Sequence, residues 1–255
     1  MKKTENVILD FSHVYPENIE TQVEDLTRVD LSDISGTNMY CTKEAEDEIR
    51  NRLKDFGPEG IHFLDNGNYH YVTKIFLDKI KEPFSLVLFD YHNDMQIPII
   101  HDLISCGSWA REVLKENHYL QQLILIGPDQ KSIDEIDSDI QEKLICISIQ
   151  ELEQHKAKKM AEKIQREFPV YFSIDKDVLN RYAARTNWNQ GRMSLDMLEM
   201  LLYQICAHQK VIGADIGGEC STQEPFNELI CDKSINEATN EVLYRFFRNV
   251  LDTLR

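Results

Sequence analysis

The carboxylates and imidazoles of one short stretch have the types and the spacing of metal ligands. Residues 86–89 are apolar at every position, and Asp90, His92 and Asp94 follow at alternate positions. A short run that is apolar throughout predicts a strand buried on both faces, as in a parallel sheet covered by helices. If the chain stays extended, the three polar side chains point to one side and form most of a divalent-metal site. A polar turn, for which Asn93 and Asp94 are suited, is the alternative.

Further polar residues follow other apolar runs, where strands would end. Asp175 and Asp177 follow residues 170–174, and His70 comes shortly after residues 61–64. In parallel α/β proteins the loops at this edge of the sheet converge and hold ligands. Together these stretches supply four carboxylates and two imidazoles, which suit two hard or borderline divalent cations. Two such ions, roughly 3.5–4 Å apart, can share a bridging water and provide hydroxide at neutral pH.

Helical and strand patterns alternate around these residues. We expect strands at residues 7–9, 61–64, 86–89, 123–127, 144–147, 170–174 and 211–214. Helices are expected at 43–56, at 72–80, from 109 and at 194–208, and Thr42 would cap the first of them. Two further helices would begin at capping boxes. One box is formed by Ser148 and Glu151 and starts a helix that reaches 168, and the other is formed by Ser234 and Glu237. Residues 16–40 show no clear pattern. Because no linker interrupts the alternation, we predict a single domain, residues 1–255, with a mostly parallel sheet.

Composition limits the classes of partner. The net charge is −16, from 28 basic and 44 acidic residues, which argues against binding to nucleic acid or to an anionic membrane. The sequence has no apolar stretch long enough for a signal-peptide core or a transmembrane helix. Its 6 cysteines form no C-x-x-C pair and favour a reduced protein. We therefore expect a cytoplasmic protein with a small-molecule substrate.

Three motifs, in this order along the chain, resemble those of the ureohydrolase family, the arginases and agmatinases, within the arginase–deacetylase superfamily. Residues 67–71 (GNYHY) look like the family's Gly-Gly-Asp-His-Ser, residues 90–94 (DYHND) like its Asp-Ala-His-x-Asp, and residues 173–177 (SIDKD) like its Ser-x-Asp-x-Asp. The resemblance implies a three-layer α/β/α fold with a mostly parallel sheet of about eight strands. It also implies two divalent metal ions, most often Mn²⁺, held by His70, Asp90, His92, Asp94, Asp175 and Asp177.

The family resemblance further implies hydrolysis of a C–N bond in a guanidino or amidino compound. A hydroxide that bridges the metals would be the nucleophile, and Asp94 would orient it. Where arginases carry a proton-shuttling His-Gly, this chain has Cys106-Gly107. Cys106 is a candidate for that role if the metal site lowers its pKa. The alternative is that Cys106 is a structural thiol and that His101, five residues earlier, takes the role. The substrate would be small and cationic, with Asp215, Glu219 and Asn187 as candidate ligands, and relatives are often homo-oligomers.

Two other functions remain open at the level of sequence. Changes in the substrate-facing motifs leave room for an amide hydrolase or deacetylase of the same fold. They also leave room for a metal-binding protein that holds a ligand without hydrolysing it.

Overall fold

A single eight-stranded parallel sheet organises the computed structural model, which describes residues 6–17, 25–98, 100 and 103–253. Across the sheet the strands follow the order β2-β1-β4-β10-β9-β5-β7-β8. Their bounds are Asn6–Asp10 (β1), Leu26–Asp30 (β2), Ile61–Phe63 (β4), Phe84–Phe89 (β5), Leu120–Ile126 (β7), Leu144–Ile147 (β8), Val170–Asp175 (β9) and Val211–Gly217 (β10). A separate antiparallel pair joins β3 (Tyr40–Cys41) to β6 (Ile104–Ser105).

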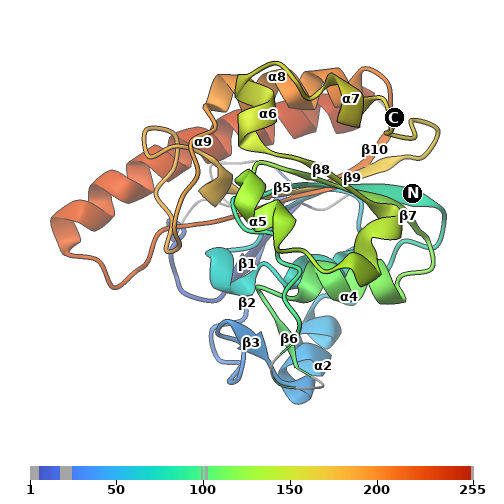
Figure 1. Cartoon of the computed structure of the whole chain (residues 1–255). Helices are drawn as coiled ribbons and strands as arrows, with labels where there is room; N and C mark the ends of the chain where they lie inside the picture. Colours follow the sequence, from blue (N-terminus) through green and yellow to red (C-terminus); the bar gives the residue numbers. More distant parts are fainter. Residues whose placement is uncertain (1–5, 18–24, 99, 101–102, 254–255) are drawn as a thin grey trace.

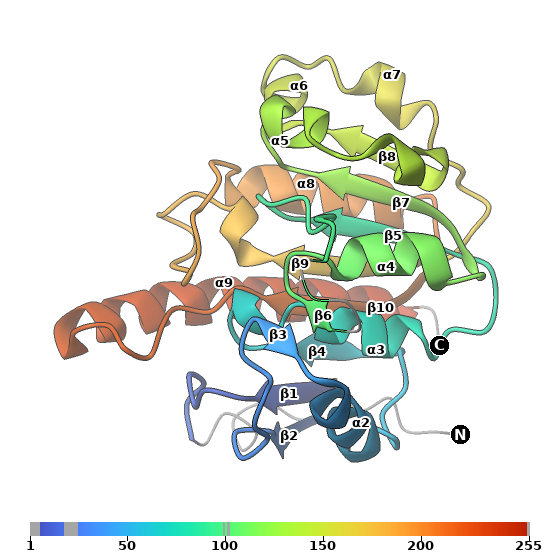
Figure 2. The same cartoon turned by 60° about the horizontal axis from the view of Figure 1, so that its bottom comes forward.

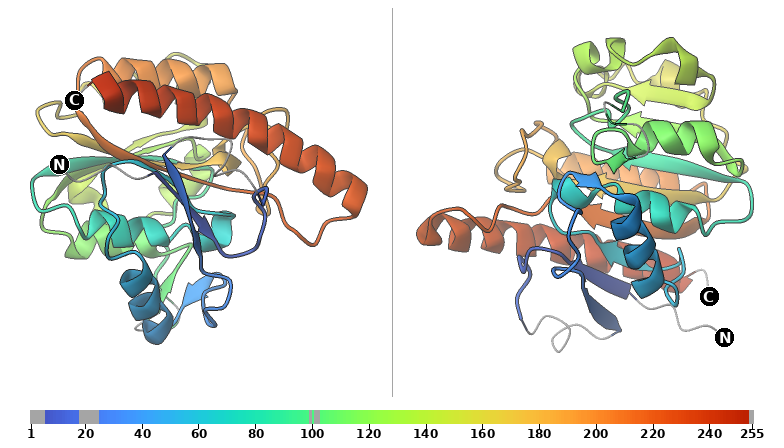
Figure 3. Two further views of the ribbon diagram at one scale, coloured as in Figure 1. Left: turned by 180° about the vertical axis from the view of Figure 1, so that it is seen from behind. Right: turned by 90° about the horizontal axis from the view of Figure 1, so that it is seen from below.

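Helices cover both faces of this sheet and complete a three-layer α/β/α arrangement (Figure 1). One face packs against α2 (Lys43–Arg52), α3 (Val72–Leu77) and α4 (Trp109–Glu116). The other packs against α6 (Ile149–Glu153), α7 (Lys158–Ala161), α8 (Leu195–Cys206) and α9 (Phe226–Thr253), and the first turns of α9 extend beyond the sheet (Figures 2 and 3). The remaining helix, α5, spans Gln130–Asp134. The expected fold class is confirmed.

The two hydrophobic cores explain why the central strands are apolar throughout. Leu86 and Leu88 of β5 belong to the core under α2–α4, whereas Val87 and Phe89 belong to the core under α6–α9. Alternate residues of a strand point to opposite faces, so burial on both faces requires an unbroken apolar run. The described part of the chain contains no helix that is both long and apolar enough to cross a membrane.

Strand pairing brings the two acidic motifs together. β5 and β9 are neighbours, and their register pairs Phe89 with Ile174. Asp90 and Asp175, which follow these partners directly, therefore lie side by side at the carboxyl edge of the sheet.

Some expected boundaries were wrong. The capping box of Ser148 and Glu151 is confirmed, but its helix ends at Glu153 instead of 168, because His155 adopts a left-handed φ of 54° and interrupts the pattern before α7. The last helix begins at Phe226, so Ser234 lies inside α9 and does not cap it. Within the unassigned residues 16–40, β2 is a partly exposed edge strand, which lacks the apolar run of the central strands.

Candidate metal centre

The turn after β5 gathers its polar side chains by bending. The strand ends at Phe89, residues 91–92 form a bend, and Asp94 has a left-handed φ of 51°. The expectation of an extended chain through Asp94 was therefore wrong. One oxygen of Asp90 accepts the backbone N–H of His92 at 2.6 Å, so the tight turn, not strand periodicity, directs the ligands inward.

A second turn presents the carboxylates that follow β9. Asp175 caps a short 3-10 helix, η3 (Lys176–Val178), and its Oδ1 accepts the backbone N–H of Asp177 at 2.9 Å. Next to it, Gly218 has a φ of +81°, and a Cβ at that position would lie 2.3 Å from Asp175 Oδ1. Glycine is therefore required at 218 so that the end of β10 can approach the turn.

Six predicted side chains meet at this edge, in two groups that share Asp90. The Nδ1 atom of His70 lies 3.3 Å from Asp90, 3.2 Å from Asp94 and 3.6 Å from Asp175. His92 Nδ1 lies 2.8 Å from Asp177 and 3.6 Å from Asp90. Each group offers at least three ligand atoms within 4.8 Å of one another, which is the spacing that one cation per group would need.

His70 provides the observation that tests whether a cation fits. Its Nε2 lies 2.8 Å from the Ser173 hydroxyl, whereas its buried Nδ1 has no hydrogen-bond partner among the described residues although three carboxylates surround it. An unpartnered buried nitrogen among carboxylates is costly, and a divalent ion would satisfy all of them at once. The donors are only oxygen and imidazole nitrogen, which suit Mn²⁺ or a similar ion.

Two tryptophans contact the candidate ligands, and neither contact could be predicted from the sequence. Trp109 is fully buried at the start of α4, donates from Nε1 to Asp94 Oδ2 at 2.6 Å, and lies 4.9 Å from the ring of His70. Trp188 stands edge-on to His92 at 5.7 Å. Groups that hold metal ligands in this way tune both the geometry and the affinity of a metal site.

The ligand set opens into a cavity of about 100 Å³. Cys106 lines it, as the shuttle hypothesis requires, with Gln96, Ser105 and Trp188 nearby. Burial, together with the charges of the metal-site carboxylates, raises the pKa of the Cys106 thiol to about 12, so the thiol is protonated at neutral pH. His101, the other shuttle candidate, lies outside the described residues.

The predicted substrate ligands do not line this cavity. Asp215 is wholly buried under α3, where Oδ1 contacts His62 Nδ1 at 2.8 Å and accepts the Tyr171 hydroxyl at 2.5 Å. The cause is strand parity, since Ala214 and Ile216 face the opposite core. Asn187 accepts the Gly67 N–H at 3.1 Å and thereby holds the turn before His70. Neither position fits a substrate ligand.

Glu219 does not face the cavity either, because its carboxylate contacts other residues. It forms a buried ion pair with Lys176, the residue between Asp175 and Asp177. Asn240 of α9 donates to Glu219 Oε1 at 2.7 Å and Asn236 donates to Oε2 at 2.9 Å. Both oxygens are therefore occupied, so Glu219 anchors the η3 turn to α9 instead of facing the metal cavity.

The side chains of the candidate metal site make the stability of the metal-free protein depend on pH. Burial and the charges of Asp177 and Asp90 raise the pKa of Asp175 to about 8. The imidazole of His92 loses solvation, which lowers its pKa, but the carboxylates of Asp177 and Asp90 outweigh this and raise it to about 12. Both groups bind more protons in the folded chain than in the unfolded chain. The free energy of unfolding of the metal-free protein therefore falls as the pH rises.

We therefore expect the chelated protein to melt at a lower temperature at pH 8 than at pH 6. Saturating Mn²⁺ should reduce the difference, because the cation replaces the protons. Melting curves of wild type and Asp175→Asn in EDTA test this, since the variant removes the raised carboxyl pKa and should flatten the pH dependence. A melting temperature that rises from pH 6 to pH 8 in EDTA would contradict the expectation.

Comparison with known proteins agrees with this geometry. The sequence model that describes the arginase family matches residues 6–223. An uncharacterised protein of Thermotoga maritima is 34% identical over 213 residues, or 83% of this chain and 78% of that protein. The structure of proclavaminate amidino hydrolase from Streptomyces clavuligerus is similar, with a TM-score of 0.68 and 16% identity over 97% of this chain and 93% of that one. A Trypanosoma cruzi formiminoglutamase variant solved with Mn²⁺ has a TM-score of 0.60 and 14% identity, over 98% and 93% of the two chains.

Proposed function

We propose, because this chain belongs to the arginase family, that it hydrolyses a C–N bond in a small guanidino or amidino compound with the help of two divalent metal ions. Membership of the family supports a metal-dependent hydrolase of the ureohydrolase type. Our proposal goes further in three respects: the number of ions, which is two, their identity as Mn²⁺, and a guanidino or amidino compound as substrate. The observation that carries the proposal is the pair of ligand groups that share Asp90 around the unpartnered Nδ1 of His70.

The distances divide the candidate ligands between two positions, each of which would hold one ion. His70, Asp94 and Asp175 surround one position, His92 and Asp177 the other, and Asp90 contributes to both. When bound, a pair of divalent ions lowers the pKa of a water molecule between them and so supplies hydroxide at neutral pH.

The residues of the chain hold the reacting groups in place. Trp109 fixes one oxygen of Asp94 by its hydrogen bond of 2.6 Å, which leaves the other oxygen to orient the attacking oxygen. The Ser173 hydroxyl, 2.8 Å from His70 Nε2, directs Nδ1 toward the carboxylates. We assign delivery of a proton to the departing nitrogen to Cys106 or His101.

The residues that line the cavity beside the candidate metal ligands indicate which compounds to test as substrates. Among the described residues that line it, the only carboxylates are the four of the metal site. Gln96, Ser105 and Trp188 supply neutral hydrogen-bonding and stacking groups. The substrate panel should therefore contain amidino compounds that carry no positive charge besides the amidinium, beside arginine, agmatine and guanidino acids.

The decisive experiment combines metal content with product analysis. Protein purified without chelator is expected to contain two ions per chain and, with added Mn²⁺, to release urea or the corresponding amide from one panel member. Two ions with release of acetate from acetylated amines, but none of the expected products, would instead identify a deacetylase. Absence of bound ions after incubation with Mn²⁺ would contradict the proposal.

A further inference from the structure

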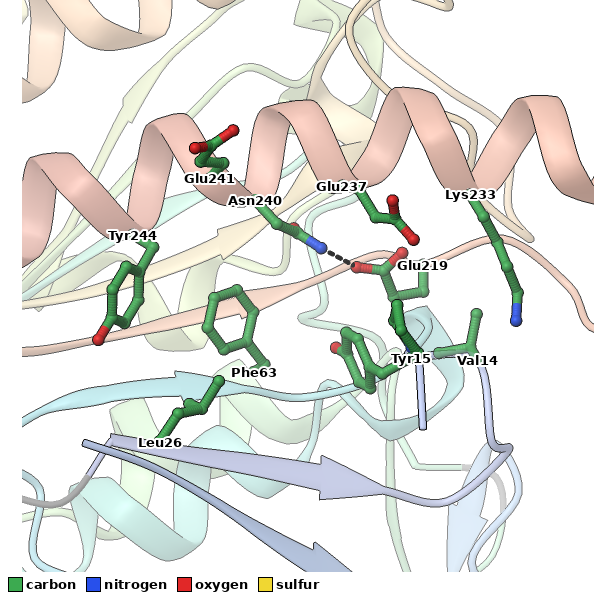
Figure 4. A pocket seen from close by; sticks show the side chains of 11 residues that line it. Val14, Tyr15, Leu26, Phe63, Glu219, Lys233, Glu237, Asn240, Glu241 and Tyr244 are labelled. Carbon is green, nitrogen blue, oxygen red and sulfur yellow. Dashed lines mark hydrogen bonds between the residues drawn. The ribbon is translucent and has the colours of Figure 1, made fainter. Parts of the chain in front are cut away.

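A second cavity, of about 350 Å³, lies between α9 and the edge of the sheet that contains β2 and β4 (Figure 4). Its volume is in the range of small-molecule sites, roughly 300–1,000 Å³. None of the six metal-site residues lines it. Its lining includes Glu219, whose carboxylate is already bound by Lys176 and Asn240.

One end of this cavity is apolar and well ordered by packing. Leu26, Phe63 and Tyr244 line it and are 7%, 4% and 8% exposed. The rings of Phe63 and Tyr244 are stacked with centroids 6.3 Å apart, and Figure 4 shows the three side chains together at one end. Such a surface suits a branched aliphatic or aromatic group of a ligand. Removal of that group from water would stabilise the complex.

The other end carries one charge of each sign that the protein itself does not use. Lys233 and Glu237 stand one helical turn apart on α9 and border the cavity. Neither forms an ion pair within the described part of the chain, whereas Glu241 on the same helix pairs with Arg245 and Glu219 pairs with Lys176. Lys233 is partly buried and Glu237 is exposed, so an ammonium and a carboxylate are available to a ligand beside the apolar end.

We propose that this cavity binds a free α-amino acid with an apolar or aromatic side chain. Lys233 would hold the ligand's carboxylate, Glu237 its ammonium, and Leu26, Phe63 and Tyr244 its side chain. An amine would leave Lys233 without a partner and a carboxylic acid would leave Glu237 without one. A zwitterion satisfies both charges, and a matched pair of charges gives specificity against ligands that carry only one.

Titration calorimetry with full-length protein tests the site, with L-phenylalanine as probe and phenethylamine and 3-phenylpropionate as its singly charged analogues. L-phenylalanine is expected to bind one molecule per chain, and each analogue at least tenfold more weakly. Lys233→Met and Glu237→Gln should each weaken L-phenylalanine roughly ten- to a hundredfold, the range for one charged hydrogen bond. Lys233→Met should leave phenethylamine affinity unchanged, which separates loss of a carboxylate partner from loss of structure.

The matched control is Glu228→Gln, an exposed position on α9 that does not line the cavity, and it should bind L-phenylalanine as wild type does. The variant with Asp90→Ala and Asp175→Ala should also bind it normally, because neither residue lines this cavity. Equal affinity for L-phenylalanine and phenethylamine, unchanged affinity in both Lys233→Met and Glu237→Gln, or no binding at millimolar ligand would each overturn the proposal.

Discussion

Replacement of both Asp90 and Asp175 by alanine is expected to abolish Mn²⁺ binding and to lower kcat/KM by at least about a thousandfold. Asp90 belongs to both ligand groups and Asp175 contacts His70, so the double variant removes ligands from each position. The metal contributes several kcal/mol to transition-state stabilisation, and each 1.4 kcal/mol or so is tenfold in rate. Metal analysis after dialysis against Mn²⁺, with kinetics on the identified substrate, measures both effects.

The same variant should remain folded, which distinguishes loss of metal from loss of structure. Burial and neighbouring carboxylates destabilise the ionised form of Asp175 in the metal-free chain, so its removal relieves repulsion. In EDTA the double variant should melt no lower than wild type. Asp129→Ala is the control, since Asp129 pairs with Arg192 near the carboxyl edge of the sheet and lies outside both ligand groups. Retention of two ions per chain by the double variant would contradict the assignment.

Lys176→Met is expected to lower the free energy of unfolding by about 3–5 kcal/mol, because it leaves Glu219 buried without its cation. For a chain of this size the melting temperature should fall by roughly 6–20 °C. Thermal and urea unfolding at saturating Mn²⁺ measure the change. Metal affinity should fall as well, since Lys176 is the residue that holds the η3 turn between two metal ligands.

A double-mutant cycle separates the charge from the packing. Adding Glu219→Gln to Lys176→Met removes the uncompensated charge and should recover part of the lost stability. Lys158→Met, at an exposed lysine of α7, should change stability by no more than about 0.5 kcal/mol. A Lys176→Met protein as stable as wild type would show that the buried pair contributes nothing.

The candidate metal ligands could be placed at one edge of the sheet from sequence because their signals are local. Asp90 and Asp175 follow the predicted strands directly, and His92 comes two residues after Asp90. The carboxyl ends of parallel strands lie at one edge of the sheet in any strand order. The register that pairs Phe89 with Ile174 cannot be read from the sequence. It decides which residues share a cation, and only the structure supplied it.

The surroundings of Trp188 and Glu219 could not be predicted because they depend on contacts between distant residues. Trp188 reaches Asn68 across 120 positions of the chain, and Glu219 finds its partners on α9. For Asp215 a usable signal did exist. Its apolar neighbours Ala214 and Ile216 belong to one face of a buried strand, so Asp215 had to point to the other face, into the core under α3.

The contacts of Lys176 with α9 also bear on the order in which the chain acquires its structure. A chain made from its N-terminus completes β5 and β9 before α9, whose Asn236 and Asn240 lie beyond the residues 6–223 that match the family. The turn with Asp175 and Asp177 therefore gains these restraints only when α9 docks on the sheet. A chain in which α9 has not yet docked would accordingly offer metal ions an unfinished site.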